Sequence, residues 1–267
     1  MEIPDIYPAM TIPAPPSHRV GMKWLLIILA GLFLVIGVFA VVYFFTANTH
    51  AGVKVIRMEG TLSTGDFSTD EGVGSEYVGN QIREAADDPT VNAIVLRVDS
   101  PGGTPAAAEE IIGDMEYAKT KKPVVVSMGD IDTSAAYYVS AHANKIYADP
   151  DTLTGAVGVI WTFTDISGWL NQEGYNITDV KSGAFKDMGT TSRALTPDEQ
   201  TYAQQIVNES FEEFITDVTT QRMIARSDIQ DGRVIRGADA LKINLVDQLG
   251  NLNDAIAGAQ QLTEQRK

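Results

Sequence analysis

Three turns in this 267-residue sequence carry residue types that could do chemistry. DSPGG, residues 99–103, could present backbone N–H groups to an oxyanion beside a helix start, or could be an ordinary strand-to-helix turn. GDIDTSAAYYVS, residues 129–140, places Ser134 at the start of a predicted helix, either as a nucleophile or as part of its cap. KSGAFKDMGTTSR, residues 181–193, supplies two lysines, and a lysine acts as a general base only when it is neutral.

The candidate bases are few, because the chain has no cysteine and three histidines. This composition excludes a thiol nucleophile and a cysteine-based metal site, and the histidines lack the spacing of a zinc protease, so we expect no metal and no cofactor. His142 follows Ser134 by eight residues on one predicted helix, about 12 Å along its axis, which is too far for a hydrogen bond. The other histidines flank an apolar run. A serine–lysine pair is what remains, with Lys181 and Lys186 both eligible.

The elements that must position these residues alternate along the chain. Short runs rich in Val and Ile predict strands at 53–58, 93–99, 123–129, 145–149 and 177–181. Amphipathic stretches predict helices at 76–86, 105–120 and 197–223. Thr104 is the expected N-cap of the second helix, and Thr196 with Glu199 forms a capping-box pattern before the third. This alternation predicts an α/β fold with a largely parallel sheet.

The N-terminal part has a different composition. Residues 1–23 form a Pro-rich tail, and residues 24–45 form an uncharged apolar run. An extent of 22 residues gives about 33 Å of helix, enough for a hydrocarbon core of about 30 Å. A buried core helix or a cleaved signal peptide would be shorter, so we expect a retained transmembrane helix. Residues 46–52 would then be a linker, and residues 53–267 the folded domain.

The charge pattern bears on location and on partners. Two basic residues of the tail, Arg19 and Lys23, immediately precede the apolar run, which favours a cytoplasmic N-terminus and an extracytoplasmic domain at the cell membrane. They balance the two acidic residues of the tail, so the formal net charge of −15 lies entirely after the run. An acidic domain argues against a nucleic-acid partner, whose recognition needs a basic surface.

Five segments in this order resemble the signal peptide peptidase A family of serine proteases, peptidase family S49. They are LRVDSPGG (96–103), VVVSMGDIDTSAAYYVS (124–140), KIYADPDTLTGAVGVI (145–160), KSGAFKDMGTTSR (181–193) and DGRVIRGADALKINLVDQLG (231–250). The resemblance covers most of the region from about 53 to 250. It implies a membrane-anchored serine endopeptidase of the short, single-repeat type. It also implies a ClpP/crotonase-like spiral of ββα units, assembled as a ring-shaped homo-oligomer that degrades hydrophobic peptides such as cleaved signal peptides.

The resemblance also implies roles for particular residues. Ser134 takes the nucleophile position, and Lys186, 52 residues later, takes the position of the general base and acid, which separates it from Lys181. The implied oxyanion hole consists of the backbone N–H groups of Gly103 and Ala135.

Two departures from the family pattern are present. Ala135 and Ala136 stand where the family usually has two glycines, which leaves a backbone donor with less conformational freedom. Ala156 replaces the serine that helps to position the lysine, in the sequence Thr154-Gly155-Ala156. The alternatives are an NfeD-type membrane serine protease with other substrates, a catalytically degenerate membrane scaffold, and, third, an acyl-CoA enzyme of the crotonase type.

Overall fold

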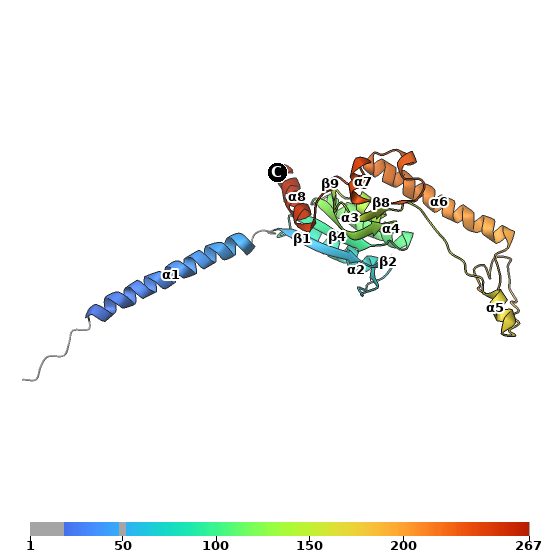
Figure 1. Cartoon of the computed structure of the whole chain (residues 1–267), viewed down its shortest axis with the longest axis horizontal. Coiled ribbons are helices and arrows are strands. Elements are labelled where there is room, and N and C mark those ends of the chain that lie inside the picture. Colours follow the sequence, from blue (N-terminus) through green and yellow to red (C-terminus); the bar gives the residue numbers. More distant parts are fainter. Residues whose placement is uncertain (1–18, 48–51, 267) are drawn as a thin grey trace, which may run out of the picture. The chain divides into compact units, whose positions relative to one another are not determined.

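The computed structural model describes residues 19–47 and 52–266, which belong to two units, residues 1–51 and 52–267 (Figure 1). In the first unit, helix α1 runs from Arg19 to Ala47. The side chains described within it, residues 24–39, are exposed and almost all apolar. Most of the predicted tail and linker, residues 1–18 and 48–51, lies outside the described residues.

The predicted transmembrane helix, residues 24–45, falls within α1. Among the helices of the described residues, none combines the length and the apolar character that crossing a membrane requires.

The second unit is built on a seven-stranded sheet whose main path has the order β1–β4–β5–β6–β9. All pairs along this path are parallel. The five strands are β1 (Val53–Glu59), β4 (Ala93–Ser100), β5 (Val124–Thr133), β6 (Lys145–Ala148) and β9 (Gln248–Leu249). The α/β fold with a mostly parallel sheet that the sequence predicts is therefore confirmed.

Two short strands branch from the carboxyl end of β5. Strand β7 (Leu153–Gly155) pairs with β5 in parallel, and β8 (Val234–Arg236) pairs with β7 in antiparallel fashion. A separate two-stranded sheet joins β2 (Thr61–Ser63) to β3 (Gly72–Gly74). Strand β7 thus lies beside the end of β5, where the Ser134 turn begins, and Leu62 of β2 forms a bridge to Gly103.

Helices cover both faces of the main sheet, so the central strands are buried on both sides. In β4, Ile94 and Leu96 belong to the larger core, while Ala93 and Val95 face a smaller core beneath the C-terminal helix. Burial on both faces is why these strands appear in the sequence as continuous apolar runs. The helices of this unit are α2 (Ser75–Asp87), α3 (Pro105–Lys119), α4 (Ala135–Ala141), α5 (Ser167–Gln172), α6 (Pro197–Arg222), α7 (Gly237–Lys242) and α8 (Leu252–Gln265), with a 3₁₀ turn η2 (Arg226–Asp228).

Both predicted helix caps are confirmed. The Thr104 side chain accepts a hydrogen bond from the Ala107 N–H at the start of α3. Thr196 and Glu199 exchange the two hydrogen bonds of a capping box at the start of α6.

One predicted strand is wrong. Residues 177–181 form no strand, and they are exposed. A β-strand requires a partner that takes up its backbone N–H and C=O groups, and none of the strands described for residues 52–266 pairs with this segment. It belongs instead to a long excursion between β7 and α6, residues 160–196, which we call the arm. Figure 1 shows α5, which is part of the arm, near the end of α6 that lies away from the sheet.

Candidate active site

Ser134 occupies a strained turn between β5 and α4. Its φ of 55° and ψ of −128° lie in a region that side-chain-bearing residues rarely adopt. Two backbone hydrogen bonds hold it there. The Ser134 N–H donates to the Gly155 carbonyl of β7 over 2.9 Å, and the Tyr138 N–H donates to the Ser134 carbonyl over 2.9 Å. Strain of this kind persists where the surroundings over-determine the conformation, which is a common property of functional sites.

The glycine turn after β4 packs directly against this serine. Gly102 has a φ of 104°, and a Cβ atom built on it would lie 2.9 Å from the Ser134 Cβ and 2.9 Å from the Thr133 carbonyl oxygen. A Cβ atom on Gly103 would lie 2.0 Å from the Leu62 carbonyl oxygen. Neither position has room for a larger residue, so the two consecutive glycines permit a close approach of two backbones.

Gly103, Ser134 and Ala135 line one cavity of about 690 Å³. Ala135 is the first residue of α4, and the first N–H groups of a helix have no partner within it. The cavity walls mix polar groups with apolar side chains, and the apolar part includes Val157, Val159, Phe211 and Phe214. Its charged lining residues are all acidic, namely Glu109, Glu213 and Asp231. The predicted nucleophile and both predicted oxyanion donors are thus brought together beside a space that can hold a substrate.

The structure does not bring Lys186 to this place. Of the described residues that line the cavity, none is a lysine. Lys186 lies in the arm between α5 and α6 and is exposed. Its backbone N–H donates to the Gly183 carbonyl. No salt bridge of Lys186 occurs within residues 52–266. The predicted Ser134–Lys186 pair is therefore not assembled within this single chain.

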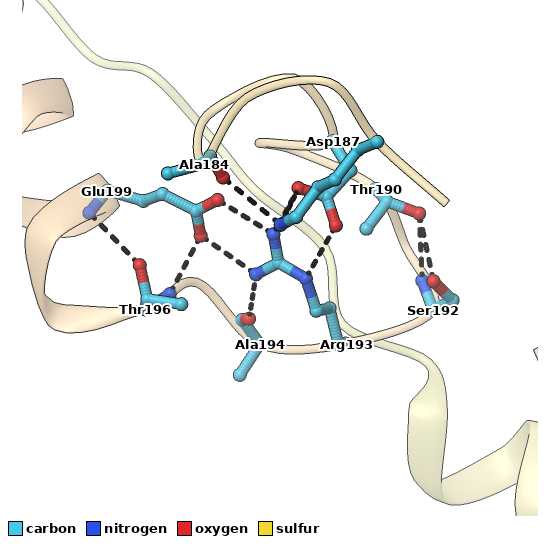
Figure 2. A network of polar contacts seen from close by, with 9 residues as sticks. Ala184, Asp187, Thr190, Ser192, Arg193, Ala194, Thr196 and Glu199 are labelled. Atoms are coloured by element: carbon cyan, nitrogen blue, oxygen red, sulfur yellow. Dashed lines mark hydrogen bonds and ion pairs between the residues drawn. The ribbon is translucent and has the colours of Figure 1, made fainter. Parts of the chain in front are cut away.

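The other candidate lysine, Lys181, joins a polar network around Asp187. Figure 2 shows this network where Asp187, Arg193 and Glu199 meet. The Lys181 ammonium group pairs with the Asp187 carboxylate and donates to the Ala184 carbonyl. Arg193 contacts the same carboxylate and makes a bidentate pair with Glu199, with N···O distances of 2.8 and 2.7 Å. Hydrogen bonds from Arg193 and Lys181 hold the pKa of Asp187 well below its usual range. Lys181 is therefore engaged in a structural ion pair.

The network also fixes the start of α6. Glu199 is buried, and its carboxylate accepts from Arg193 and from the Thr196 N–H. The hydrogen bonds from Arg193 and then from the Thr196 backbone lower the pKa of Glu199 to about 2. The arm and α6 are therefore joined by charges that stay ionised.

Among the described residues, histidine is represented by His142, whose ring contacts lie elsewhere in the fold. His142 follows directly after α4 as its C-cap, and its two ring nitrogens contact the carboxylates of Glu116, at 3.1 Å, and Asp217, at 2.7 Å. These contacts connect α4 to α3 and α6. The expectation that His142 is not the base for Ser134 agrees with this placement.

Sequence reasoning did not single out Asp132, which lies two residues before Ser134 and is completely buried. Burial, with a smaller contribution from the charge of Asp99, raises the pKa of Asp132 to about 7, although a hydrogen bond from Ser140 opposes the shift. The available indication was a charged residue near the end of a strand that begins with a buried apolar run. It is easily overlooked, because an alternating pattern at the end of a strand usually places such a residue in solvent.

A strained serine at the head of a helix, beside backbone donors and a cavity, is the arrangement that enzymes with a serine nucleophile use for acyl transfer. A family model described as peptidase family S49 matches residues 116–266. The chain therefore belongs to peptidase family S49, and the predicted membership is confirmed. By family, its class is that of serine-type proteases.

Named relatives agree with this family. Protease 4 of Salmonella typhi is 37% identical over 222 residues, which cover 82% of this chain and 36% of that protein. Protease 4 of Haemophilus influenzae is 32% identical over 224 residues, with the same shares of 82% and 36%. "Serine protease SPPA, chloroplastic" of Arabidopsis thaliana is 29% identical over 219 residues, covering 80% of this chain and 32% of that protein. The chain thus spans about one third of the length of these relatives.

A solved structure of a membrane-bound stomatin-specific protease aligns with this chain with a TM-score of 0.48 and 16% sequence identity. The alignment covers 76% of this chain and 81% of the chain of that structure.

Proposed function

We propose that this chain is a serine endopeptidase in which Ser134 is the nucleophile and Lys186 the general base. The observation that carries the proposal is the placement of the strained Ser134 beside Gly103 and Ala135 on one cavity. The finer fold assignment, a ClpP/crotonase-like spiral, belongs to the same proposal. It is supported by the parallel sheet and by the order of the five family-like segments.

The proposed reaction is acyl transfer to serine and then to water. Neutral Lys186 takes the proton of the Ser134 hydroxyl as Oγ bonds to the peptide carbonyl carbon. The N–H groups of Gly103 and Ala135 stabilise the oxyanion, an effect worth roughly 3–4 kcal/mol for each donor. The Lys186 ammonium returns its proton to the leaving amine as the C–N bond breaks. Water, deprotonated by the same lysine, then releases the acyl group and restores the serine.

The lysine is proposed to come from a second copy of the chain within a ring-shaped homo-oligomer. Two observations support this arrangement. The cavity beside Ser134 is lined by no lysine among the described residues, and Lys186 lies on the arm without a salt bridge. The arm also exposes apolar side chains that a neighbouring copy could cover, including Ile160 and Val180.

The proposed substrates are hydrophobic peptides, including cleaved signal peptides. The apolar side chains on one part of the cavity wall, among them Val157, Phe211 and Phe214, support this class, because apolar side chains of a peptide gain from burial against them. The proposed location is the cell membrane, with residues 24–45 as a single-pass anchor and the protease domain outside the cytoplasm. The exposed apolar side chains of α1 and the basic residues before them support this location.

A degenerate scaffold is the second candidate function, favoured by Ala156 at the family's lysine-positioning serine and by the absence of lysine from the described lining of the cavity. A fluorophosphonate probe, which reacts covalently with activated serines, separates the two. We expect mass spectrometry to find the label on Ser134 in the full-length protein.

Three variants complete this experiment. Ser134→Ala and Lys186→Ala should each lose labelling and peptide cleavage by at least 100-fold, because each removes a participant in the chemical step. Lys181→Ala is the matched control and should keep most activity, because Lys181 pairs with Asp187. An unlabelled, correctly assembled protein would favour the scaffold, and a fully active Lys186→Ala would exclude the proposed base.

A further inference from the structure

The side chain of Tyr138 forms part of the cavity wall beside Ser134. Tyr138 lies about one turn along α4 from Ser134, and its N–H donates to the Ser134 carbonyl over 2.9 Å. Side chains on a helix lean toward its N-terminus, so the ring of Tyr138 covers the turn that begins at Ser134. The side chain lines the cavity, although only 7% of the residue is exposed. A peptide residue held at Ser134 therefore has this ring as a neighbour.

Contacts from three helices hold the Tyr138 ring in place. Its hydroxyl donates to the Glu109 Oε1 of α3 over 2.6 Å. The ring of Phe214 from α6 packs against it, with ring centroids 4.7 Å apart and an interplanar angle of 41°. His142 at the end of α4 meets it edge-on, with centroids 6.0 Å apart. A ring fixed by a hydrogen bond and by packing on two sides does not swing aside for a larger substrate without losing these contacts.

The space between Ser134 and this ring is short. Four residues of α-helix advance about 6 Å along the axis, and the Tyr138 ring itself takes up part of that distance. Val157 and Phe211 add apolar side chains to the same cavity wall. An aliphatic side chain of a substrate is short enough for this space, whereas an aromatic one would have to displace the Tyr138 ring.

We propose that Tyr138 is a specificity-determining residue, which admits aliphatic side chains beside the scissile bond and excludes aromatic ones. The side chain that it selects belongs to the residue whose carbonyl carbon Ser134 attacks. This inference rests on the proposed function and narrows its substrate class from hydrophobic peptides to those with an aliphatic residue at that position. Glu109 is a positioning residue in this arrangement, because it acts on the substrate through the Tyr138 hydroxyl.

The decisive variant is Tyr138→Leu, which removes the ring and keeps an apolar, helix-forming residue. We would measure kcat/KM for two peptides that differ only at the residue on the acyl side of the scissile bond, leucine in one and phenylalanine in the other. The ratio of the two values within one protein cancels the fraction of folded enzyme. We expect wild type to favour the leucine peptide, and the ratio of phenylalanine to leucine to rise about tenfold or more in the variant. The matched control is Tyr137→Leu at the next residue, which is fully buried and does not line the cavity, and its ratio should equal that of wild type. An unchanged ratio in Tyr138→Leu would overturn the inference.

Variants of Glu109 test the same inference with the tyrosine in place. Glu109 is exposed, so its replacement leaves the core intact. Glu109→Ala frees the Tyr138 hydroxyl and should raise the ratio of phenylalanine to leucine by about fivefold, the value of one ordinary hydrogen bond. Glu109→Gln keeps an oxygen that accepts from the hydroxyl, so it should keep the ratio of wild type. Where Tyr138→Leu does not fold, an unchanged ratio in Glu109→Ala overturns the inference.

A binding measurement separates this inference from the proposed function. Calorimetric titration of the Ser134→Ala protein with the same two peptides, with and without Glu109→Ala or Tyr138→Leu, measures selectivity without catalysis. If wild type cleaves neither peptide and fluorophosphonate leaves Ser134 unlabelled, the proposed function fails, and these affinities decide the inference alone. A shift of the affinity ratio toward the phenylalanine peptide in the variants would support it. Equal ratios, or no binding of either peptide, would overturn it.

Discussion

The backbone of Ser134 carries strain that its own side chain does not relieve. Its φ of 55° with a ψ of −128° suits glycine, and a residue with a Cβ atom held there costs on the order of 1–3 kcal/mol. The hydrogen bond to Gly155 and the close packing of Gly102 impose this conformation. The serine side chain is needed for the proposed reaction, whereas the backbone conformation favours glycine. The folded protein should therefore be more stable with glycine at this position.

Replacing Ser134 with glycine should therefore stabilise the fold. We expect the free energy of unfolding of Ser134→Gly to exceed that of Ser134→Ala by about 1 kcal/mol, because glycine adopts a positive φ without steric cost. Urea denaturation followed by circular dichroism measures this difference. The matched control is Ala135→Gly at the next residue, the first of α4, which should destabilise by about 0.5–1 kcal/mol. Equal stabilities for Ser134→Gly and Ser134→Ala would mean that the turn is not strained.

At the scale of elements, the sequence predicts those parts of the fold whose stabilisation is local or periodic. The strands around 53–58, 93–99, 123–129 and 145–149 are evident, because burial on both faces requires continuous apolar residues. The caps at Thr104 and Thr196 are evident, because each hydrogen bond joins residues three apart. The segment 177–181 has a strand-like composition, but it lacks a partner strand, and that depends on distant residues.

In the candidate site, too, the features set by local sequence could be predicted, and those that depend on distant residues could not. The turns that carry Gly103, Ser134 and Ala135 could be recognised individually, and strand order explains why they meet, since β4 and β5 are parallel neighbours. The burial of Asp132 could not be predicted, because it depends on β7 and on the packing of α4. The distance of Lys186 from this site could not be predicted either, because local sequence does not say where a long arm lies.

The ion pair of Arg193 with Glu199, which connects the arm to α6, predicts how the arm responds to low pH. The ion pair with Arg193 lowers the pKa of Glu199 to about 2. The ionised Glu199 therefore contributes fully to stability above about pH 4.5, and this contribution is lost as the pH falls toward 2. Trp161 and Trp169 lie in the arm, and in a Trp24→Phe background their fluorescence reports on it. We expect the tryptophan fluorescence of the otherwise wild-type protein to change only between about pH 4.5 and 2.

Arg193→Gln should move this transition toward higher pH, because the buried Glu199 loses its bidentate partner but keeps the Thr196 N–H. The control is Arg226→Gln, which removes another bidentate arginine–glutamate pair, the exposed one with Glu212 on α6. An exposed pair contributes little, so the control should titrate like wild type. A similar shift in both variants would show that net charge, and not the joint at Glu199, controls the arm.

At the scale of the whole molecule, the arm is the feature that the single chain leaves unexplained. It exposes Val180 at 98% and Ile160 at 90%, and the ion pairs of Arg193 with Asp187 and Glu199 connect it to α6. An extended apolar surface held in a fixed place costs free energy in water unless a partner covers it. The proposed ring of identical subunits would provide such a partner, since every copy would offer its arm to a neighbour and receive another at its own site.

This arrangement can be tested by mixing two inactive proteins. Ser134→Ala keeps the lysine, and Lys186→Ala keeps the serine, so a mixed ring contains some sites with both groups if the dyad forms between copies. For equal random mixing, about a quarter of sites are complete, and we expect labelling and cleavage to recover to about that fraction of wild type. The control replaces the first protein with a variant that carries both Ser134→Ala and Lys186→Ala, which should restore nothing. Mixed rings, verified by distinct tags on the two variants, that stay inactive would show that each chain must supply its own lysine. The arm would then have to fold back along α6 to reach Ser134.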